Sequence, residues 1–552
     1  MKIDSTAKTS PSDSGNFERN SEPADFIERV SANQRKLTSD LKSHYDFIVC
    51  GSGSSGSVVA RRLAENPKVS VLLLEAGSND DVPSVMDADQ WFTNLGTERD
   101  WGFQAQPNPG VNARTLPMSM GKVLGGGSSI NVMYWARGHQ NDWNYFADEA
   151  GDAAWNYESV LNIYRSIEDW HGEPDPQYRG TGGPMFIQPS LPTSPIARAM
   201  FEGALSLGIP TFENRNGRMM QDDGGCSLIE RAIRDGRRLS VFRSYTFPYM
   251  DRLNLTVLTQ AMVTRVIIES KRATGVEIAY DGKVLRIDAG FEVVLSLGAM
   301  NTPKILMLSG IGDQAELQRL GIPLVQHLPG VGQNFQDHLL LLGCVWEHQQ
   351  PEAVARREQA VLMWKSNSSL DTPDMVCVQG EGAFVSVETA KFNPPPNSWT
   401  IAPGIFRPKS RGHIRLAGAN PSDPVEIEAN FLSDPDDLKA MITSVELCRD
   451  LANSTSLRPF VKREVIPGGM KGKALENFVR DSVGTYWHQT CTAKMGRDSM
   501  SVVDGNLKVY GIDNLRIADG SIMPRVTTGN TMAPCIVIGE RAGEIMKIAH
   551  QL

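Results

Sequence analysis

The sequence lacks the features that would place this protein in a membrane, outside the cell or on a nucleic acid. No run of about 18 apolar residues occurs, so we expect no transmembrane helix. The N-terminal stretch, MKIDSTAKTSPSDSGNFERN, contains no apolar segment of the kind that signal peptides carry. A net charge of −9 leaves no excess of Lys and Arg to neutralise phosphates, which excludes nucleic acid as an expected partner.

Cysteine is scarce, and its spacing follows no known pattern. The seven cysteines are odd in number and scattered, and no C-x-x-C pair occurs among them. Such cysteines are typical of reduced thiols, and they do not predict a zinc site. We therefore expect a cytoplasmic protein without a bound metal.

The sequence does contain enough apolar material for a large core. At 552 residues and 41% hydrophobic composition, the chain is expected to form two to four domains or one large composite fold. Residues 1–44 form an N-terminal extension. Its Ser-, Asp- and Asn-rich part, up to about residue 22, is predicted to be disordered, and the apolar spacing that follows predicts a helix.

The segment YDFIVCGSGSSGSVVARRLAENPKVSVLLLEAG, residues 45–77, has the order of elements found in dinucleotide-binding units. DFIVC predicts a buried parallel strand, SVVARRLAE predicts a helix, and VSVLLLE predicts the next strand. Gly51 would allow the tight turn, Gly53 the approach of the backbone to a pyrophosphate, and Gly56 the close packing of helix on strand. Glu75 could accept hydrogen bonds from both ribose hydroxyls. The segment alone does not separate NAD from FAD.

The rest of the chain predicts a second region of a different type. Residues 255–299 alternate apolar and polar side chains around two turn signals, which predicts an antiparallel β meander that leads into a buried strand. Short strand patterns mix with helices between about 314 and 470, so we expect a mixed α+β region there. The long segment 78–120 has no strong period and is expected to be a functional or disordered loop.

Five blocks resemble, in order and spacing, the signature segments of the glucose–methanol–choline (GMC) oxidoreductases. They are GKVLGGGSSINVMYWARGHQNDWN (121–144), GAMNTPKILMLSGIG (298–312), LPGVGQNFQDHL (328–339), YWHQTCTAKMG (486–496) and IADGSIMPRVTTGNTMAP (517–534). The similarity covers nearly the whole chain from residue 45 to 548. The cofactor that this resemblance implies is FAD.

The resemblance also implies a fold. It predicts an α/β FAD-binding domain of the Rossmann-like, GMC type, and a second α+β substrate-binding domain with a mixed or antiparallel sheet. The FAD-binding domain would be discontinuous, built from residues 45–160, 236–315 and 475–552. The substrate-binding domain would take residues 161–235 and 316–474.

Cofactor contacts follow from the same resemblance. The glycine turn would hold the ADP half, Val263 would contact the adenine through its backbone, and the block after Gly121 would run beside the isoalloxazine. The expected cofactor-binding residues are Gly51, Gly53, Ser54, Ser55, Gly56, Glu75, Ala76, Gly121, Val123, Gly126, Ser128, Asn131, Val132, Met133, Val263, Asp519, Gly520, Asn530 and Thr531. Ile130 stands where members with covalently bound FAD often carry a histidine. Because an alkyl side chain cannot form that bond, we expect FAD to be bound non-covalently.

The chemistry that the resemblance implies is oxidation of an alcohol to a carbonyl, with proton loss to a base and hydride transfer to flavin N5. His488 aligns with the family's catalytic histidine and would be the base, since the ordinary pKa of histidine lies near neutrality. Asn530 takes the second position of the catalytic pair, where its amide could hold the substrate oxygen. His338 is expected to fix structure through hydrogen bonds with Asp337.

Several points stay open. Trp101 and Trp487, with Trp91, are expected to cap an apolar substrate pocket, although simple packing of these tryptophans is an equal alternative. A non-redox FAD-containing lyase, similar to hydroxynitrile lyases, and a flavin photodecarboxylase are the alternative functions; the second should need a basic anchor, which the sequence does not reveal. The expected partners are a small-molecule alcohol and an electron acceptor: oxygen, a quinone or a redox protein.

Overall fold

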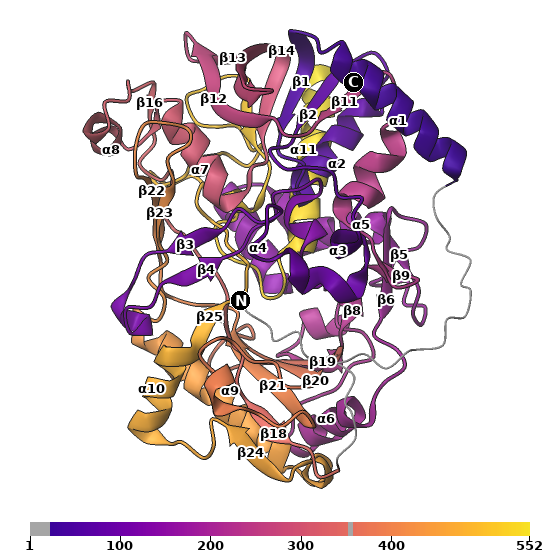
Figure 1. Cartoon of the computed structure of the whole chain (residues 1–552), viewed down its shortest axis with the longest axis vertical. Coiled ribbons are helices and arrows are strands. Elements are labelled where there is room, and N and C mark those ends of the chain that lie inside the picture. The colour runs from indigo at the N-terminus through magenta and orange to yellow at the C-terminus, as the bar shows by residue number, and fades with distance from the viewer. Residues whose placement is uncertain (1–22, 351–356) are drawn as a thin grey trace.

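The computed structural model describes residues 23–350 and 357–552, whose course is shown in Figure 1. The disorder expected up to residue 22 falls outside the described residues. The helix expected after it is present as α1 (Ala24–Ser39). The Gln34 side chain docks this helix on the first sheet, because its amide donates to the backbone oxygens of Met250 and Leu255.

The first sheet has seven strands in the order β11-β2-β1-β14-β13-β12, with β26 also paired to β14. Their bounds are β1 (His44–Cys50), β2 (Val71–Leu74), β11 (Leu255–Leu258), β12 (Met262–Glu269), β13 (Arg272–Tyr280), β14 (Lys283–Leu295) and β26 (Leu515–Ile517). β11, β2, β1, β14 and β26 pair in parallel, whereas β12, β13 and β14 form the expected antiparallel meander. The continuous apolar runs of β1 and β2 are explained by burial on both faces.

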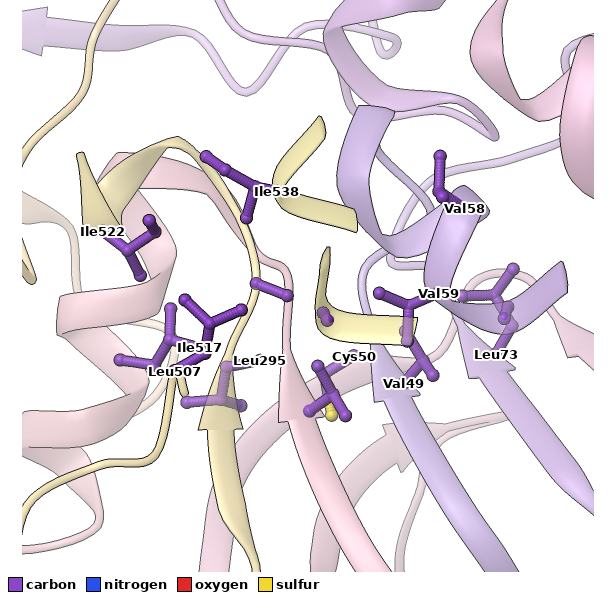
Figure 2. Close-up of a cluster of buried hydrophobic side chains, with 14 of the residues drawn as sticks. Val49, Cys50, Val58, Val59, Leu73, Leu295, Leu507, Ile517, Ile522 and Ile538 are labelled. Atoms are coloured by element: carbon purple, nitrogen blue, oxygen red, sulfur yellow. The ribbon is translucent and has the colours of Figure 1, made fainter. Parts of the chain in front are cut away.

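Two helices pack against each other on this sheet, α2 (Ser54–Ala64) and α11 (Met532–His550). Figure 2 shows their apolar side chains in one cluster with side chains of β1, β2, β14 and β26. The residues labelled there are Val49, Cys50, Val58, Val59, Leu73, Leu295, Leu507, Ile517, Ile522 and Ile538. The cluster joins segments from both ends of the chain, so the first domain is assembled from distant parts of the sequence.

The second sheet lies toward the other end of the molecule (Figure 1) and is antiparallel. Its order is β24-β18-β21-β20-β19-β7, and β17 pairs with both β21 and β25. The bounds are β7 (Gly225–Leu228), β17 (Leu339–Leu341), β18 (Val345–Glu347), β19 (Arg357–Trp364), β20 (Met375–Glu381), β21 (Ser398–Ile405), β24 (Arg463–Ile466) and β25 (Val483–Thr485). The structure therefore contains an α/β domain and a second α+β domain, as expected.

One expected boundary is wrong in detail. The sequence assigned all of 475–552 to the first domain, but β25 pairs with β17 and so belongs to the second sheet. α10 (Gly472–Ser482), which precedes β25, packs against α9 (Pro435–Asn453) of the second domain. The chain thus leaves the second domain only after Thr485, immediately before the block that contains His488.

Smaller elements complete the fold. The other helices are α3 (Pro83–Met86), α4 (Gln140–Ala150), α5 (Tyr157–Ile167), α6 (Pro195–Ser206), α7 (Gly298–Leu308) and α8 (Gln314–Arg319). The short strands are β3 (Phe103–Ala105), β4 (Leu116–Met118), β5 (Glu168–Trp170), β6 (Met185–Pro189), β8 (Glu230–Arg231), β9 (Ile233–Arg234), β10 (Arg237–Arg238), β15 (Ile311–Gly312), β16 (Gln326–His327), β22 (His413–Leu416) and β23 (Val425–Glu428). Within residues 23–350 and 357–552, no helix is long and apolar enough to span a bilayer, and no group of three or more His, Cys, Asp and Glu residues could hold a metal ion.

Candidate active site

A cavity opens where four parallel strands of the first sheet end. Gly51 follows β1, Glu75 follows β2, Ser296 follows β14 and Asp519 lies just beyond β26, and all four residues line the cavity. Open α/β sheets bind their ligands at the carboxyl ends of parallel strands. The cavity therefore lies where the sequence predicts the dinucleotide.

The glycine turn after β1 has the geometry that its residues predict. Gly51 has a φ of +98°, a conformation that side chains other than glycine's rarely adopt. A Cβ at Gly56 would lie 1.9 Å from the backbone oxygen of Gly51, so only glycine lets α2 pack this closely on the turn. A Cβ at Gly53 would meet no atom within 4 Å, and Gly53 lines the cavity. A ligand can therefore approach the backbone closely at Gly53.

Glu75 is buried and already accepts hydrogen bonds from the protein. Its Oε2 accepts from the backbone N of Ser52 at 3.1 Å and from the Ser52 Oγ at 2.6 Å, and its Oε1 accepts from the N of Gly77 at 2.8 Å. Burial raises the pKa of Glu75, and these donors oppose that rise. A carboxylate accepts about four hydrogen bonds. Glu75 thus has room for about one ribose hydroxyl rather than the two that the sequence suggested.

Most of the expected cofactor-binding residues meet in this cavity. Those that line it are Gly51, Gly53, Ser54, Ser55, Glu75, Ala76, Gly121, Gly126, Ser128, Asn131, Val132, Asp519, Gly520, Asn530 and Thr531. Those that do not are Gly56, Val123, Met133 and Val263. Val263 lies in β12, opposite Ile278 of β13, so its assignment to the adenine remains a prediction. The N-terminal turn of α7 also lines the cavity, and the sequence did not indicate this contact.

His488 is held by the turn that follows β25. Its backbone N donates to Asp337 Oδ1 at 2.8 Å, and Trp487 before it has a φ of +59°, which is rare for so bulky a residue. The backbone N of Trp487 donates to the Thr485 hydroxyl at 2.8 Å, which fixes this conformation. Strain of this kind is typical of functional sites, and here it directs the His488 side chain into the cavity lining.

The His488 ring is held by hydrogen bonds at both nitrogens. Asn530 Nδ2 lies 3.1 Å from Nε2, and His338 Nδ1 lies 2.8 Å from Nδ1. Because the amide of Asn530 donates to Nε2, that nitrogen carries a lone pair, and the ring proton sits on Nδ1, where it is donated to His338. The arrangement selects the tautomer in which Nε2 can accept a proton.

Burial keeps this histidine neutral. Desolvation, aided by the charge of Arg215, lowers the pKa of His488 to about 3. Desolvation and the neighbouring His488 also lower the pKa of His338. The neutral imidazole carries a lone pair with which it can accept a proton.

His338 has a second role beside the one that the sequence suggested. Its backbone amide interacts with Asp337, as expected, and its ring Nδ1 also contacts the ring of His488, while Asp337 accepts from the His488 backbone and from the Thr485 hydroxyl. The sequence could not show this, because β17 and β25 bring the two histidines together only in the folded chain. The sequence also gave no sign of Arg215, which acts electrostatically on His488.

The expected substrate tryptophans also line the cavity. Trp91, Trp101 and Trp487 are all in its wall, together with Tyr134 and Tyr486. Trp101 stacks on Phe103 at a centroid distance of 5.8 Å. One continuous cavity therefore joins the glycine turn and Glu75 at one end to an aromatic wall, His488 and Asn530.

Comparisons with known proteins agree with this arrangement. Two models of the GMC oxidoreductase family match residues 45–340 and 408–539. The mitochondrial choline dehydrogenase of Mus musculus is 34% identical over 93% of this chain and 91% of its own, and the alcohol dehydrogenase [acceptor] of Pseudomonas putida is 34% identical over 91% and 95%. The crystal structure of pyridoxine 4-oxidase from Mesorbium loti matches with a TM-score of 0.85 at 30% identity, over 92% of this chain and 99% of its own. The chain belongs to the GMC oxidoreductases, and it is an FAD-dependent enzyme that acts on the CH–OH group of alcohols.

Proposed function

We propose that His488 is the base that takes the hydroxyl proton of a small-molecule alcohol while Asn530 holds the oxygen. The observation that carries this proposal is the pair of nitrogens, His488 Nε2 and Asn530 Nδ2, which lie 3.1 Å apart in the wall of the cavity that also contains the glycine turn. An oxygen placed against both nitrogens can donate its proton to the imidazole and accept a hydrogen bond from the amide.

Each side chain has a separate task in this mechanism. His488 accepts the proton at Nε2, and its Nδ1–H stays on His338, which holds the ring in place. Asn530 has no proton to give up, so its amide stabilises the negative charge that develops on the substrate oxygen. Both residues are largely buried, at 8% and 7% exposure, so water competes little for these hydrogen bonds.

The residues of the cavity fit FAD. The glycine turn and Glu75 would hold the ADP half, and Asp519 and the glycine-rich block after Gly121 the flavin half. FAD supplies the acceptor for the hydride that leaves the alcohol carbon. Asn530 Oδ1 is buried without a hydrogen-bond partner, as expected for a polar atom that a bound molecule would satisfy.

We also propose that FAD is held without a covalent bond. Ile130 lines the cavity and is buried, and its alkyl side chain cannot bond to the flavin. Precipitation of the holoenzyme with acid should release all yellow colour into the supernatant. Flavin that remains with the denatured polypeptide would contradict this proposal.

The electron acceptor and the compartment are further proposals. We favour a quinone or a redox protein over oxygen as the acceptor, and a cytoplasmic location. The seven cysteines are all free thiols in the structure, which supports a reducing compartment.

A panel of primary alcohols tests the proposed function. Each alcohol is offered to the holoenzyme, and dye reduction is compared with peroxide release in air. Alcohol-dependent dye reduction with little peroxide is the expected result. Peroxide in proportion to the alcohol consumed would identify an oxidase, and no reduction by any alcohol would contradict the assignment of the catalytic pair.

The pH dependence should reflect the lowered pKa of His488. The neutral ring is the base, so kcat/KM should be constant above the pKa and fall as the pH drops through it. Because burial places that pKa well below its usual value of about 6.5, we expect kcat/KM to show no loss between about pH 8 and pH 6. A loss centred near pH 6.5 to 7 for several alcohols would show that His488 is not held neutral by burial.

Trp101 should influence which alcohols are accepted. Its indole is in the cavity wall and is only partly buried, so truncation would widen the pocket. Trp101→Ala should lower kcat/KM for aromatic alcohols relative to short aliphatic ones by about five-fold, since an aromatic contact contributes on the order of 1 kcal/mol beyond the buried area. Ratios equal to those of the wild type would show that Trp101 only packs.

A further inference from the structure

The side chain of Arg215 is a buried cation without a carboxylate partner. It is 1% exposed, and its hydrogen-bond contact is the thioether Sδ of Met363, at 3.7 Å. Its Nε has no partner, and no salt bridge to Arg215 occurs among the described residues. Charged groups are rarely buried unless they are paired, because the lost hydration is costly. An exception of this kind calls for a functional explanation.

Arg215 lies next to the catalytic pair. A Cβ at Gly529, the residue before Asn530, would be 3.6 Å from its Nη2. Its charge interacts electrostatically with Tyr134 and Tyr486, which line the cavity, and with His488. Arg215 itself is buried and does not line the cavity, so its influence on a substrate would be exerted by its charge rather than by direct contact.

Nearby acids do not neutralise this charge. Glu230 interacts electrostatically with Arg215, but its carboxylate forms a salt bridge with Arg179 at 2.7 Å. Arg179 also contacts Glu168 at 2.9 Å, and Glu168 contacts Arg137 at 2.6 Å. These two carboxylates and two guanidinium groups balance one another. One positive charge, that of Arg215, is left over beside the site.

The aromatic wall is also already in contact with cations of the protein. Lys122 Nζ lies 4.9 Å from the centroid of the Trp101 ring, and the Arg231 guanidinium lies 5.2 Å from that of Tyr134. In the described part of the chain, the carboxylates that line the cavity are Glu75 and Asp519, and both accept hydrogen bonds from backbone amides. The carboxylates in the cavity wall are therefore already hydrogen-bonded, and these two rings already contact cations of the protein. Neither is available to bind a cationic substrate.

We infer that this enzyme selects its alcohol by charge: it takes neutral or carboxylate-bearing alcohols and rejects quaternary ammonium alcohols, with Arg215 as the residue responsible. The inference rests on the proposed alcohol oxidation and adds the substrate class. It separates this chain from relatives that are named choline dehydrogenases, since choline carries a permanent positive charge. If the guanidinium of Arg215 and a substrate ammonium group lie roughly 10 Å apart, their repulsion at an effective dielectric constant of about 20 weakens binding of the substrate on the order of ten-fold.

Two pairs of substrates with matched shapes test this inference in the holoenzyme. Choline and 3,3-dimethylbutan-1-ol differ in charge but hardly in shape, as do 4-(hydroxymethyl)benzoate and 4-(hydroxymethyl)benzamide. For the wild type, we expect kcat/KM to favour 3,3-dimethylbutan-1-ol over choline and the benzoate over the benzamide, each about ten-fold or more. Choline used as well as its neutral analogue would overturn the inference. If no alcohol of either pair is oxidised, the proposed function itself fails.

Variants of Arg215 show whether this residue causes the discrimination between charged and neutral alcohols. Arg215→Met removes the charge and should reduce both ratios about ten-fold, whereas Arg215→Lys should keep them. Arg198→Met, which removes an exposed charge from α6, controls for net charge and should leave both ratios unchanged. Ratios unchanged in Arg215→Met would overturn the role of Arg215.

Thermal unfolding separates this role from a structural one. Replacing an unpaired buried charge by an apolar side chain of similar length is often neutral or stabilising, so Arg215→Met should have a Tm equal to or above that of the wild type. A Tm lowered by many degrees would show that Arg215 supports the fold instead. Should Arg215→Met fail to fold, Arg215→Gln makes the same substrate comparison, and the wild-type ratios alone can still overturn the inference.

Discussion

Replacing His488 with alanine is expected to slow the reduction of bound FAD by alcohol roughly 10²- to 10⁴-fold, the usual contribution of general acid–base catalysis. The Nε2 atom of the imidazole faces the amide of Asn530 in the cavity wall, and burial keeps the ring neutral. Without it, the hydroxyl proton has no acceptor in the wall. Stopped-flow absorbance of the flavin under anaerobic conditions measures this step directly.

The His488→Ala variant should still bind FAD, because the glycine turn and Glu75 are untouched. It should also recover part of its rate at high pH, where more of the substrate is already alkoxide. Asn530→Ala should slow the same step without this recovery, since an amide has no proton to lose. His171→Ala is a matched control, because that ring is exposed and bonds to Asp169 at 2.9 Å. Near wild-type flavin reduction in His488→Ala would place the base elsewhere.

Removing the Glu75 carboxylate is the second change expected to have a large effect. In Glu75→Ala, the affinity for FAD should fall about 10- to 150-fold, which corresponds to one charge-assisted hydrogen bond of roughly 1.5–3 kcal/mol to a ribose hydroxyl. The affinity should fall further if the turn loosens, because the backbone amides of Ser52 and Gly77 would lose their acceptor. Fluorescence titration of the apoprotein with FAD gives the dissociation constant.

Glu75→Gln distinguishes the two contributions. It keeps one oxygen acceptor and the shape of the side chain, so it should retain more of the affinity than alanine does. Glu202→Ala, an exposed carboxylate on α6, serves as a control for charge. An unchanged dissociation constant in Glu75→Ala would mean that this carboxylate does not contact the cofactor.

The parts of the fold that depend on local sequence could be predicted. β1, α2 and β2 follow from two apolar runs, three glycines and a helical spacing within about 30 residues, and the structure places them as expected. The meander and α9 also follow from short-range periodicity. His488 and Asn530 could be named only through the resemblance to a family, because a lone histidine beside a tryptophan is more often a core residue.

The features that the sequence did not reveal depend on contacts between distant segments. The hydrogen bond between His338 and His488 spans 150 positions and requires β17 to pair with β25. The number of further hydrogen bonds that Glu75 can accept depends on Ser52 and Gly77, whose amides donate to it only in the folded chain. The unpaired state of Arg215 is visible only when Arg179 and Arg137 are seen to hold the nearby acids. No motif around Arg215 marks it as different from other arginines.

Anaerobic flavin reduction with a deuterated substrate shows whether the enzyme removes a proton and a hydride from an alcohol. The holoenzyme is mixed in the dark with 3,3-dimethylbutan-1-ol and with the same alcohol deuterated at the carbinol carbon. We expect the flavin absorbance to be lost with both alcohols, more slowly with the deuterated one, and His488→Ala to lower both rates. Substrate turnover while the flavin stays oxidised, or turnover that requires light, would contradict this expectation.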